Sequence, residues 1–561
     1  MELTITFGLL WGMVYYNMMN VKQIIEARLK QIEPTATLSV SDKADFQCNT
    51  AFALAKQQHQ NPNTIATQIA AEWNKQATEL ATATVIGGFI NFTLSNQQLQ
   101  AVAEYVIQNQ RLPLASQTPR TVFFDYGGAN TAKELHIGHL RSPIIGEALK
   151  RVFQAFGHKT IAGAYLGDWG LQNGLVLASL IEQGIDCEQV TLQMLGEIYP
   201  NASKRKNVDP EFYERAATVT LKLQNLEEPY YSMWQKLRAL SVKQVQKNYE
   251  KLNCTFDLYD GESSYQANVD TVIDILRNKG LVEKSQGALI VNVAQPTDQK
   301  PMPPVIVKKQ NGGDLYATSD IAAIYTRMQQ YHPDQFVYIT DARQNLHFEQ
   351  IFRVARLAGL VPETTTLTHI GYGTINGKDG KPFKTRDGGT IKLEDIMDTV
   401  ANATTEFAVG LSAIKFADLI NQVHKDYVFD LQKCTAFEGK TGPYILYTIV
   451  RINAIFSKVG TFNCNFNNLA QYMTPTVRNI ILSVIKLAEA YNVAINTLSL
   501  NAIADAIYNL ANNFTAFYAE QNIIHENDAA KKECYLSVAQ LVKTALEFGL
   551  NTLAIDTVEK M

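Results

Sequence analysis

Cysteine is scarce in this 561-residue chain, and its arrangement excludes two kinds of site. The six cysteines are scattered, and no two of them form a C-x-x-C pair. Structural zinc sites need closely spaced pairs, and disulfide frameworks need many cysteines in a small secreted fold. The sequence therefore predicts no protein-bound zinc and no disulfide framework, and it favours a protein of the reducing cytoplasm.

An excess of positive charge is also missing. The chain has 50 lysines and arginines against 54 aspartates and glutamates, a formal net charge of −4. Any nucleic-acid partner would have to be contacted through local basic patches, because no global field attracts it. With 46% hydrophobic and 19% charged residues the composition is that of a globular protein, and the length predicts several domains.

The first eighteen residues contain an apolar and aromatic run, LTITFGLLWGMVYY. This run lacks the basic start and the small-residue cleavage site of a signal peptide, and it is too short to span a bilayer comfortably. An amphipathic helix is predicted directly after Met19, over residues 20–33. We expect that translation begins at Met19 or that residues 1–18 are an ill-ordered extension, and we expect no membrane partner.

The stretch from Thr121 to Leu149 organises the rest of the chain. A β-branched and aromatic run, Thr121–Phe124, predicts a buried strand, and a glycine-rich turn follows it. Apolar residues at helical spacing then predict a helix from near Leu135, and a second strand is predicted over Thr160–Leu166. Strand, loop, helix and strand make a βαβ unit, in which the helix N-terminus is suited to binding phosphate.

Two histidines, His136 and His139, are predicted to lie in the first turn of that helix and to project from one face. Gly138 between them removes side-chain bulk, so a flat ring or a phosphate could approach the backbone. The imidazoles could donate hydrogen bonds to phosphate oxygens in a transition state. An isolated H-x-x-H is more often a metal half-site or a surface pair, but the preceding strand and glycine loop favour the phosphate site.

HIGH at residues 136–139 resembles the signature of class I aminoacyl-tRNA synthetases, and GGANTAKELHIGHLRS is similar to the arginyl-tRNA synthetase version. The resemblance covers nearly the whole chain from Met19 onward. It implies an α/β fold with a Rossmann-like, parallel-sheet catalytic domain, a small α+β N-terminal domain and an all-α C-terminal anticodon-binding domain. It also implies a monomer that uses L-arginine, tRNA and ATP with Mg²⁺, and arginine activation that needs bound tRNA.

Side chains suited to a guanidinium occur in the second half of the catalytic region. A planar cation with five donors is recognised by partly desolvated carboxylates in fork geometry, and Glu262 and Asp320 are the candidates. Tyr316 would share a helix face with Asp320, Gln344 can both donate and accept, and Asn130 could hold the α-amino or carboxylate group. All five lie in segments that resemble the family's arginine-pocket motifs, although each alone could be a cap, surface or loop residue.

Residues 371–396 alternate glycine with lysine and arginine, which predicts a mobile basic loop that closes over phosphates, or else a solvated charged turn. The loop stands in the place of the class I KMSKS motif, and its PFKTR resembles the arginyl form. Thr385 occupies the position of the class's catalytic lysine, and in this family a lysine before HIGH is thought to compensate, here Lys133. The predicted catalytic residues are His136, His139, Lys133, Lys384 and Arg386, and the predicted ATP-binding residues are His136, Gly138, His139, Lys133, Lys384 and Thr385.

The expected domains are a small α+β domain over residues 19–108, a catalytic domain over 118–398 and a helical domain over 401–561. A helical insertion is expected at about 190–255. In the first domain, DFQCNTAFALAK resembles the family's tRNA-contacting domain, helices are predicted over 20–33 and 63–80, and a strand over 85–94. In the last domain, helices are predicted over 475–493, 500–520 and 528–548.

An aromatic and basic stripe is predicted on a further helix of the last domain. Tyr444, Tyr447 and Arg451 are spaced by three and four residues, so they share a face that can stack bases and hold phosphate. Buried tyrosines are the commoner cause of such a pattern. The resemblance to an anticodon-binding domain favours tRNA contact.

The function predicted from this resemblance is the ATP-dependent ligation of L-arginine to tRNA through arginyl-adenylate. Two alternatives remain open at this point. One is another class I synthetase or a nucleotidyl transferase of the same fold, which the Glu262 and Asp320 pair disfavours. The other is a non-catalytic RNA-binding paralogue, which has no use for intact HIGH histidines.

Overall fold

The computed structural model describes residues 20–41, 43–131, 133–310, 312–313, 315–377, 379–380, 391–404 and 406–561. These residues belong to two compact units. The central unit contains Pro119–Ala403 and Asn421–Leu431. The terminal unit contains the chain up to Thr118, Thr404–Ile420 and Gln432–Met561.

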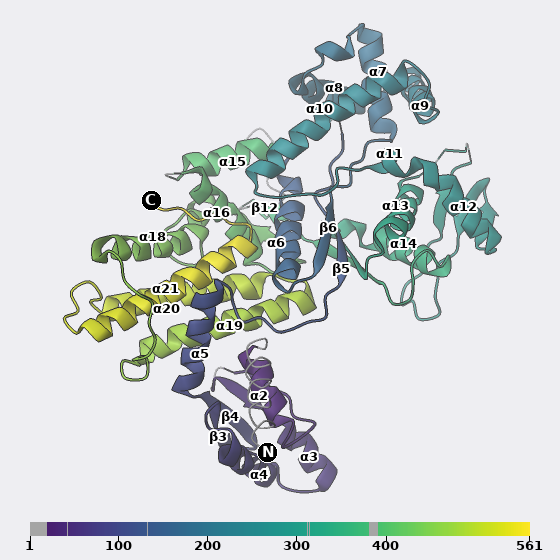
Figure 1. The fold of residues 1–561 in the computed structure, drawn as a ribbon. Helices are drawn as coiled ribbons and strands as arrows, with labels where there is room; N and C mark the ends of the chain where they lie inside the picture. Colours follow the sequence, from purple (N-terminus) through teal and green to yellow (C-terminus); the bar gives the residue numbers. More distant parts are fainter. Residues whose placement is uncertain are drawn as a thin grey trace, which may run out of the picture. The chain divides into compact units, whose positions relative to one another are not determined.

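A four-stranded parallel sheet lies at the centre of the central unit, in the order β11-β10-β5-β6. Its strands are β5 (Thr121–Asp125), β6 (Lys159–Gly163), β10 (Gln335–Asp341) and β11 (Thr366–Tyr372). Helix α6 (Arg141–Ala155) connects β5 to β6, and α14 (Asn345–Leu357) connects β10 to β11 (Figure 1). The two crossovers lead to opposite edges of the sheet, so β5 and β10 flank a topological switch point, where α/β folds bind ligands.

These strands form where the sequence has continuous apolar runs, as expected for a parallel sheet covered on both faces. Val122, Phe123 and Phe124 of β5 are fully buried. The strand predicted over Thr121–Phe124 is confirmed and extends one residue further, to Asp125. The strand predicted over Thr160–Leu166 ends earlier, at Gly163.

Four helices of the central unit share a separate apolar core. They are α7 (Leu171–Gln183), α8 (Leu192–Arg205), α9 (Pro210–Gln224) and α10 (Tyr230–Lys251), and Figure 1 shows them grouped together. In that core the indole rings of Trp169 and Trp234 meet edge to face, with centroids 4.8 Å apart. The helical periodicity after residue 190 is thus present as α8, α9 and α10, and the shared core joins α7 to them.

A three-stranded antiparallel sheet in the central unit was not predicted. It consists of β7 (Val282–Ser285), β8 (Ala288–Val291) and β9 (Val305–Lys308), and it packs with α12 (Val269–Asn278) and α13 (Tyr316–Tyr331) in one core. The strands are short and several of their residues are exposed, so their apolar pattern is weak. Two more short strands, β12 (Ile375–Asn376) and β13 (Tyr427–Val428), pair in parallel, so the region after residue 401 is not helical throughout.

The N-terminal part of the terminal unit is an antiparallel sheet with helices. Its strands, in the order β1-β2-β4-β3, are β1 (Ser39–Val40), β2 (Phe46–Cys48), β3 (Ala81–Ile86) and β4 (Phe89–Leu94). Its helices are α2 (Val21–Leu29), α3 (Thr50–Gln58), α4 (Pro62–Gln76) and α5 (Asn96–Asn109). The single strand predicted over residues 85–94 is wrong, because Gly87 and Gly88 turn the chain between β3 and β4 at φ values of +57° and +89°.

The C-terminal part of the terminal unit is helical. Its helices are α16 (Phe407–Leu419), α17 (Leu431–Cys434), α18 (Gly442–Val459), α19 (Pro475–Thr497), α20 (Asn501–Glu520) and α21 (Ala529–Thr552). The three predicted helices are confirmed as α19, α20 and α21. Thr474 caps α19 by accepting the Val477 N–H, and Pro475 follows at the first helical position. Among the described helices only α19 has the length and hydropathy to cross a membrane, and 67% of that stretch is buried.

Candidate active site

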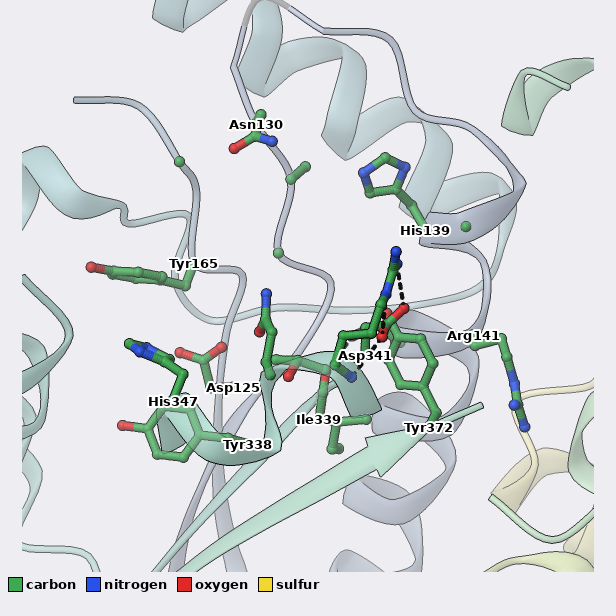
Figure 2. A pocket seen from close by; sticks show the side chains of 18 of the residues that line it. Asp125, Asn130, His139, Arg141, Tyr165, Tyr338, Ile339, Asp341, His347 and Tyr372 are labelled. Carbon is green, nitrogen blue, oxygen red and sulfur yellow. Dashed lines mark hydrogen bonds and ion pairs between the residues drawn. The ribbon is translucent and has the colours of Figure 1, made fainter. Parts of the chain in front are cut away.

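A cavity of about 930 Å³ opens at the carboxyl ends of β5 and β10, at the switch point of the parallel sheet. All five candidate arginine-binding residues and all three candidates of the HIGH motif line it: Asn130, Glu262, Tyr316, Asp320 and Gln344, and His136, Gly138 and His139. Tyr165, Tyr338 and His347 lie on one side of the cavity, and His139 and Arg141 lie on the other (Figure 2). Tertiary structure therefore brings together residues that are up to 214 positions apart, Asn130 and Gln344 (344 − 130).

The two imidazoles do not lie in the first turn of α6, which corrects the predicted helix start near Leu135. Residues Ile137–His139 form a single 3₁₀ turn, and α6 begins at Arg141. The rings nevertheless lie side by side, with centroids 4.0 Å apart. A Cβ at position 138 would lie 2.8 Å from the His136 ring, so the close packing of this turn requires Gly138.

Both imidazoles are neutral at physiological pH. Burial, followed by the nearby charge of Lys133, lowers the pKa of His136 to about 4. Burial, His136 and Lys133 lower the pKa of His139 to about 3. Nδ1 of His136 accepts the Gly138 N–H at 3.1 Å, so the proton of that neutral ring lies on Nε2. Nδ1 of His139 lies 3.1 Å from the His136 backbone nitrogen and 3.3 Å from the His136 carbonyl oxygen. The turn thus presents the Nε2–H donor of His136 beside a second neutral imidazole.

The glycine-rich loop after β5 is joined to the loop after β6 by backbone pairing. Gly167 donates to the Ala129 carbonyl at 2.9 Å, and Thr131 donates to the Gly167 carbonyl at 3.1 Å. A Cβ at Gly167 would lie 2.2 Å from Oδ1 of Asn130, so this crossing needs glycine. The Asn130 Oδ1 also accepts a hydrogen bond from Gln172 at 3.0 Å, which orients the amide at the cavity wall.

Asp168 positions Glu262. It follows Gly167 in a turn with the sequence GDWG, residues 167–170. The Asp168 carboxylate is fully buried and accepts from Arg238 Nε at 2.6 Å, from Ser263 N at 2.9 Å and from Ser263 Oγ at 2.7 Å. Glu262 adjoins Ser263 at the start of α11 (Glu262–Tyr265), and its Oε2 accepts the Trp169 N–H at 3.2 Å. This turn therefore packs Trp169 into an apolar core and also positions the carboxylate of Glu262 at the cavity.

Tyr316 and Asp320 share one face of α13, as their spacing predicted. Oδ2 of Asp320 is 2.6 Å from Nε2 of His347, a residue of α14 that the sequence pattern did not single out. The Tyr316 ring lies 4.9 Å from the His347 ring, and Tyr316 itself is largely exposed. The carboxylate is therefore held by a histidine rather than acting as a helix cap.

Glu262 and Asp320 line the same cavity, and the charge of Asp320 acts on Glu262. Burial, and next the charge of Asp320, raises the pKa of Glu262 to about 7. Burial and the charges of both carboxylates also raise the pKa of Tyr165 well above its ordinary value. The buried Tyr165 hydroxyl has no hydrogen-bond partner among the described residues. A cation that entered between these groups would relieve the repulsion of the two carboxylates.

A buried arginine, which no sequence pattern indicated, pairs with Asp125 of the cavity lining and with the nearby Asp260. Arg327 of α13 donates to Asp125 at 2.6 Å and to Asp260 at 3.2 Å, and its guanidinium lies 4.6 Å from the Phe123 ring centroid. Burial raises the pKa of Asp125 to about 6 despite this pairing. Since Arg327 pairs with Asp125 and Arg343 pairs with Asp341, Glu262 and Asp320 are the cavity-lining acids that have no lysine or arginine partner in the described part of the chain.

Lys133 does not line the large cavity. It lines a neighbouring cavity of about 50 Å³ with Glu134 and Lys392, and Lys392 Nζ is 2.9 Å from the Glu134 carboxylate. Its charge still lowers the pKa of both imidazoles, so it acts on the same site. Lys384, Thr385 and Arg386 lie outside the described residues.

The predicted aromatic and basic stripe is present on α18 of the terminal unit. The Arg451 guanidinium lies 4.7 Å from the Tyr447 ring and 5.2 Å from the ring of Tyr518 on α20. Tyr447 is 40% exposed, whereas the Tyr444 hydroxyl is 3.0 Å from Thr515 Oγ1. Tyr447 and Arg451 thus offer an accessible stacked pair, and Tyr444 is partly committed to packing.

Family models match three consecutive parts of the chain. Residues 19–94 match the arginyl tRNA synthetase N terminal domain, residues 101–408 match the class I (R) tRNA synthetase catalytic domain, and residues 445–561 match the DALR anticodon binding domain. A curated arginine–tRNA ligase of Alkaliphilus oremlandii is 39% identical over 93% of the chain and 95% of its own length. One of Agathobacter rectalis is 37% identical over 93% and 94%.

Solved structures support the same fold. The arginyl-tRNA synthetase of Plasmodium falciparum superposes with a TM-score of 0.80 at 24% identity, covering 97% of this chain and 100% of its own. That of Thermus thermophilus also has a TM-score of 0.80, at 21% identity, covering 96% and 100%. The matches at the level of sequence carry the assignment, and the chain therefore belongs to the arginyl-tRNA synthetase family of class I aminoacyl-tRNA synthetases.

Proposed function

We propose that the cavity at β5 and β10 binds L-arginine and ATP side by side and joins them, before the arginyl group passes to tRNA. The arginine carboxylate attacks the α-phosphorus of ATP, which forms arginyl-adenylate and releases pyrophosphate. The terminal adenosine hydroxyl of tRNA then attacks the adenylate carbonyl and AMP leaves. The observation that carries this proposal is the meeting of Glu262 and Asp320 in the cavity that also holds both imidazoles.

In the arginine subsite, we assign the guanidinium to Glu262 and Asp320. Each of these carboxylates has one oxygen held by the protein, and Tyr316 forms the neighbouring wall. Asn130 and Gln344 line the same cavity and would take the α-amino and carboxylate groups of the substrate. A lysine ammonium is a point charge that would leave a carboxylate acceptor unpaired, at a cost of roughly 1–3 kcal/mol for each buried group.

In the ATP subsite, the imidazoles of His136 and His139 would contact the phosphates, and Gly138 would let the phosphates approach the backbone. Lys133 would supply the cation that Thr385 does not, and Lys384 and Arg386 would hold the leaving pyrophosphate. The described residues contain no cluster of three metal-binding side chains. Mg²⁺ would accompany ATP and neutralise the charge of its phosphates.

The other parts of the chain are assigned to tRNA. Residues 19–108 would contact the body of the tRNA, residues 401–561 would contact the anticodon through Tyr444, Tyr447 and Arg451, and residues 118–398, with the insertion at about 190–255, would perform the chemistry. We further propose that the protein acts as a monomer in the cytoplasm, where its substrates are found.

ATP–pyrophosphate exchange across a panel of amino acids, with and without tRNA, tests this proposal. Among the amino acids only arginine should support exchange, and this exchange should need bound tRNA. Exchange driven by another amino acid would indicate a different class I enzyme. Binding of tRNA without any exchange would indicate a non-catalytic paralogue, and either result would overturn the proposal.

Replacing Asp320 with alanine tests the guanidinium assignment. Loss of one partner of a buried charge pair is worth about 2–5 kcal/mol, so the KM for arginine should rise at least about thirtyfold. The KM for ATP should change little. Asp274→Ala, which removes an exposed carboxylate of α12 that pairs with Arg277, is the control. Unchanged arginine kinetics in Asp320→Ala would remove the pocket assignment.

A further inference from the structure

His347 is held so that only one of its ring nitrogens faces Asp320. Its Nε2 lies 2.6 Å from Oδ2 of Asp320, and both side chains are 17% exposed. The Tyr316 ring lies 4.9 Å from the imidazole, and the neighbouring Phe348 ring meets it edge to face at 5.3 Å. Because the imidazole is packed by two aromatic rings, the direction of its hydrogen bond to the carboxylate is set by packing rather than by free rotation.

This bond occupies one of the two oxygens of Asp320. Among the described residues no hydrogen-bond partner is found for Oδ1 of Asp320. Glu262 shows the same division, since its Oε2 accepts the Trp169 N–H at 3.2 Å and Oε1 has no partner in the described part of the chain. The cavity therefore offers one open oxygen from each of two carboxylates, which suits a planar guanidinium that donates in several directions.

We propose that His347 is a positioning residue for arginine specificity: its Nε2–H holds Oδ2 of Asp320 and so turns Oδ1 toward the guanidinium of the substrate. The proposal rests on the proposed function, because it concerns the same arginine subsite. His347 touches the carboxylate rather than the reacting phosphate, and it lies on the opposite side of the cavity from His139 (Figure 2). Its loss should therefore weaken arginine binding and leave the phosphate chemistry intact.

Four substitutions at these two positions separate hydrogen bonding from packing. His347→Phe keeps an aromatic ring against Tyr316 but removes the donor. His347→Gln places an amide nitrogen near the Nε2 position, whereas His347→Asn places it near Nδ1, short of Asp320. Asp320→Asn, alone and combined with His347→Phe, tests whether the two residues act together. His332→Asn at the other end of α13 is the control, because its left-handed backbone conformation, φ +46°, tolerates asparagine.

We expect His347→Phe to raise the KM for arginine about tenfold, the size of a hydrogen bond to a charged group, with kcat and the KM for ATP within about twofold of the parent. His347→Gln should keep the KM for arginine within about threefold, and His347→Asn should resemble His347→Phe. In the Asp320→Asn background, His347→Phe should have no additional effect, since the oriented charge is already absent. The control should behave as the parent.

Failure of this proposal is distinct from failure of the proposed function. The unmodified protein is assayed first, and a protein that does not activate arginine refutes the function before any variant is made. If it is active, a KM for arginine in His347→Phe equal to that of the parent overturns the positioning role. A loss of kcat and of thermal stability without a change in KM also overturns it. If His347→Phe does not fold, equal KM values for arginine in His347→Gln and His347→Asn overturn the positioning role.

Discussion

At the scale of single residues, burial decides which acid of the cavity can change its charge near neutral pH. The pKa of Glu262 is raised to about 7 by burial and by Asp320. Below that pH the carboxyl carries a proton, which the arginine cation must displace. The KM for arginine should therefore rise as the pH falls through 7, by at most about tenfold for each pH unit.

The measurement is the KM for arginine at intervals from about pH 6 to about pH 8. Glu262→Gln should show a raised KM that no longer depends on pH between about pH 7 and about pH 8, a range that lies above the pKa of about 6 of Asp125. The imidazoles cannot produce this slope, because their pKa values are about 4 and about 3. An identical slope in Glu262→Gln would assign the titration to another group.

Lys133 is the second residue whose role can be tested alone. Its charge reaches both imidazoles, and thus the region where phosphate charge would develop. Lys133→Ala should slow adenylate formation about a hundredfold in a single-turnover assay, with nearly normal ATP binding. Lys392→Ala is the matched control, because that lysine lines the same small cavity but is paired with Glu134. Parent-like rates in Lys133→Ala would mean that another group supplies the cation.

At the scale of elements, the packing of α6 against the end of β5 sets the position of the histidine turn. Gly146 of α6 faces Tyr126, and a Cβ there would lie 2.1 Å from Cγ of that ring. The ring cannot move freely, because its hydroxyl lies 2.9 Å from the Glu147 carboxylate and 3.1 Å from the Thr255 carbonyl oxygen. A substitution at Gly146 therefore has to displace a helix that begins directly after the HIGH motif.

Gly146→Ala should lower the free energy of unfolding, measured by chemical denaturation. Alanine gains about 0.5–1 kcal/mol of helix propensity over glycine, but overpacking costs about 1–3 kcal/mol, so the clash prevails. Gly196→Ala in α8 is the matched control, because its Cβ would meet only the flexible carboxylate of Glu134, at 3.0 Å. That variant should be neutral or slightly more stable. A stabilised Gly146→Ala would show that the ring of Tyr126 yields easily.

At the scale of the whole molecule, the chemistry and the aromatic stripe belong to different units. Every residue that lines the large cavity, which we propose binds arginine and ATP, lies in the central unit, whereas Tyr447 and Arg451 lie in the terminal unit. Substitutions in the stripe should therefore alter the use of tRNA without altering the arginine subsite. This separation distinguishes a tRNA-binding stripe from one that only packs.

Tyr447→Ala and Arg451→Ala should each raise the KM for tRNA by about tenfold, as expected when base stacking worth about 1–3 kcal/mol is lost. At saturating tRNA the KM for arginine should stay unchanged. Val493→Ala removes an exposed apolar side chain of α19 and serves as the control. If the stripe variants keep the parent KM for tRNA but melt at lower temperature, the stripe has a structural role only.

Local sequence determined much of this protein. The apolar run of β5, the caps and periodicity of α19 to α21, and the shared face of Tyr316 and Asp320 follow from interactions within a few residues, and such patterns are legible in one chain. The string around HIGH is specific enough to indicate the family by itself. The sheet of β7, β8 and β9 was not predicted because its strands are short and partly exposed. Their buried residues are covered only by long-range packing with α12 and α13.

Only the tertiary structure decided which side chains complete the site. His347 reaches Asp320 across 27 residues of sequence, Arg327 reaches Asp125 across 202, and the Trp169 N–H reaches Glu262 across 93. No spacing rule links such positions, because parallel strands bring distant segments together through their crossovers. The protonation of Glu262 and of the imidazoles is also a tertiary property, since burial is the largest cause of each pKa shift. Sequence supplied the chemical groups, and long-range packing determined their partners and their charge.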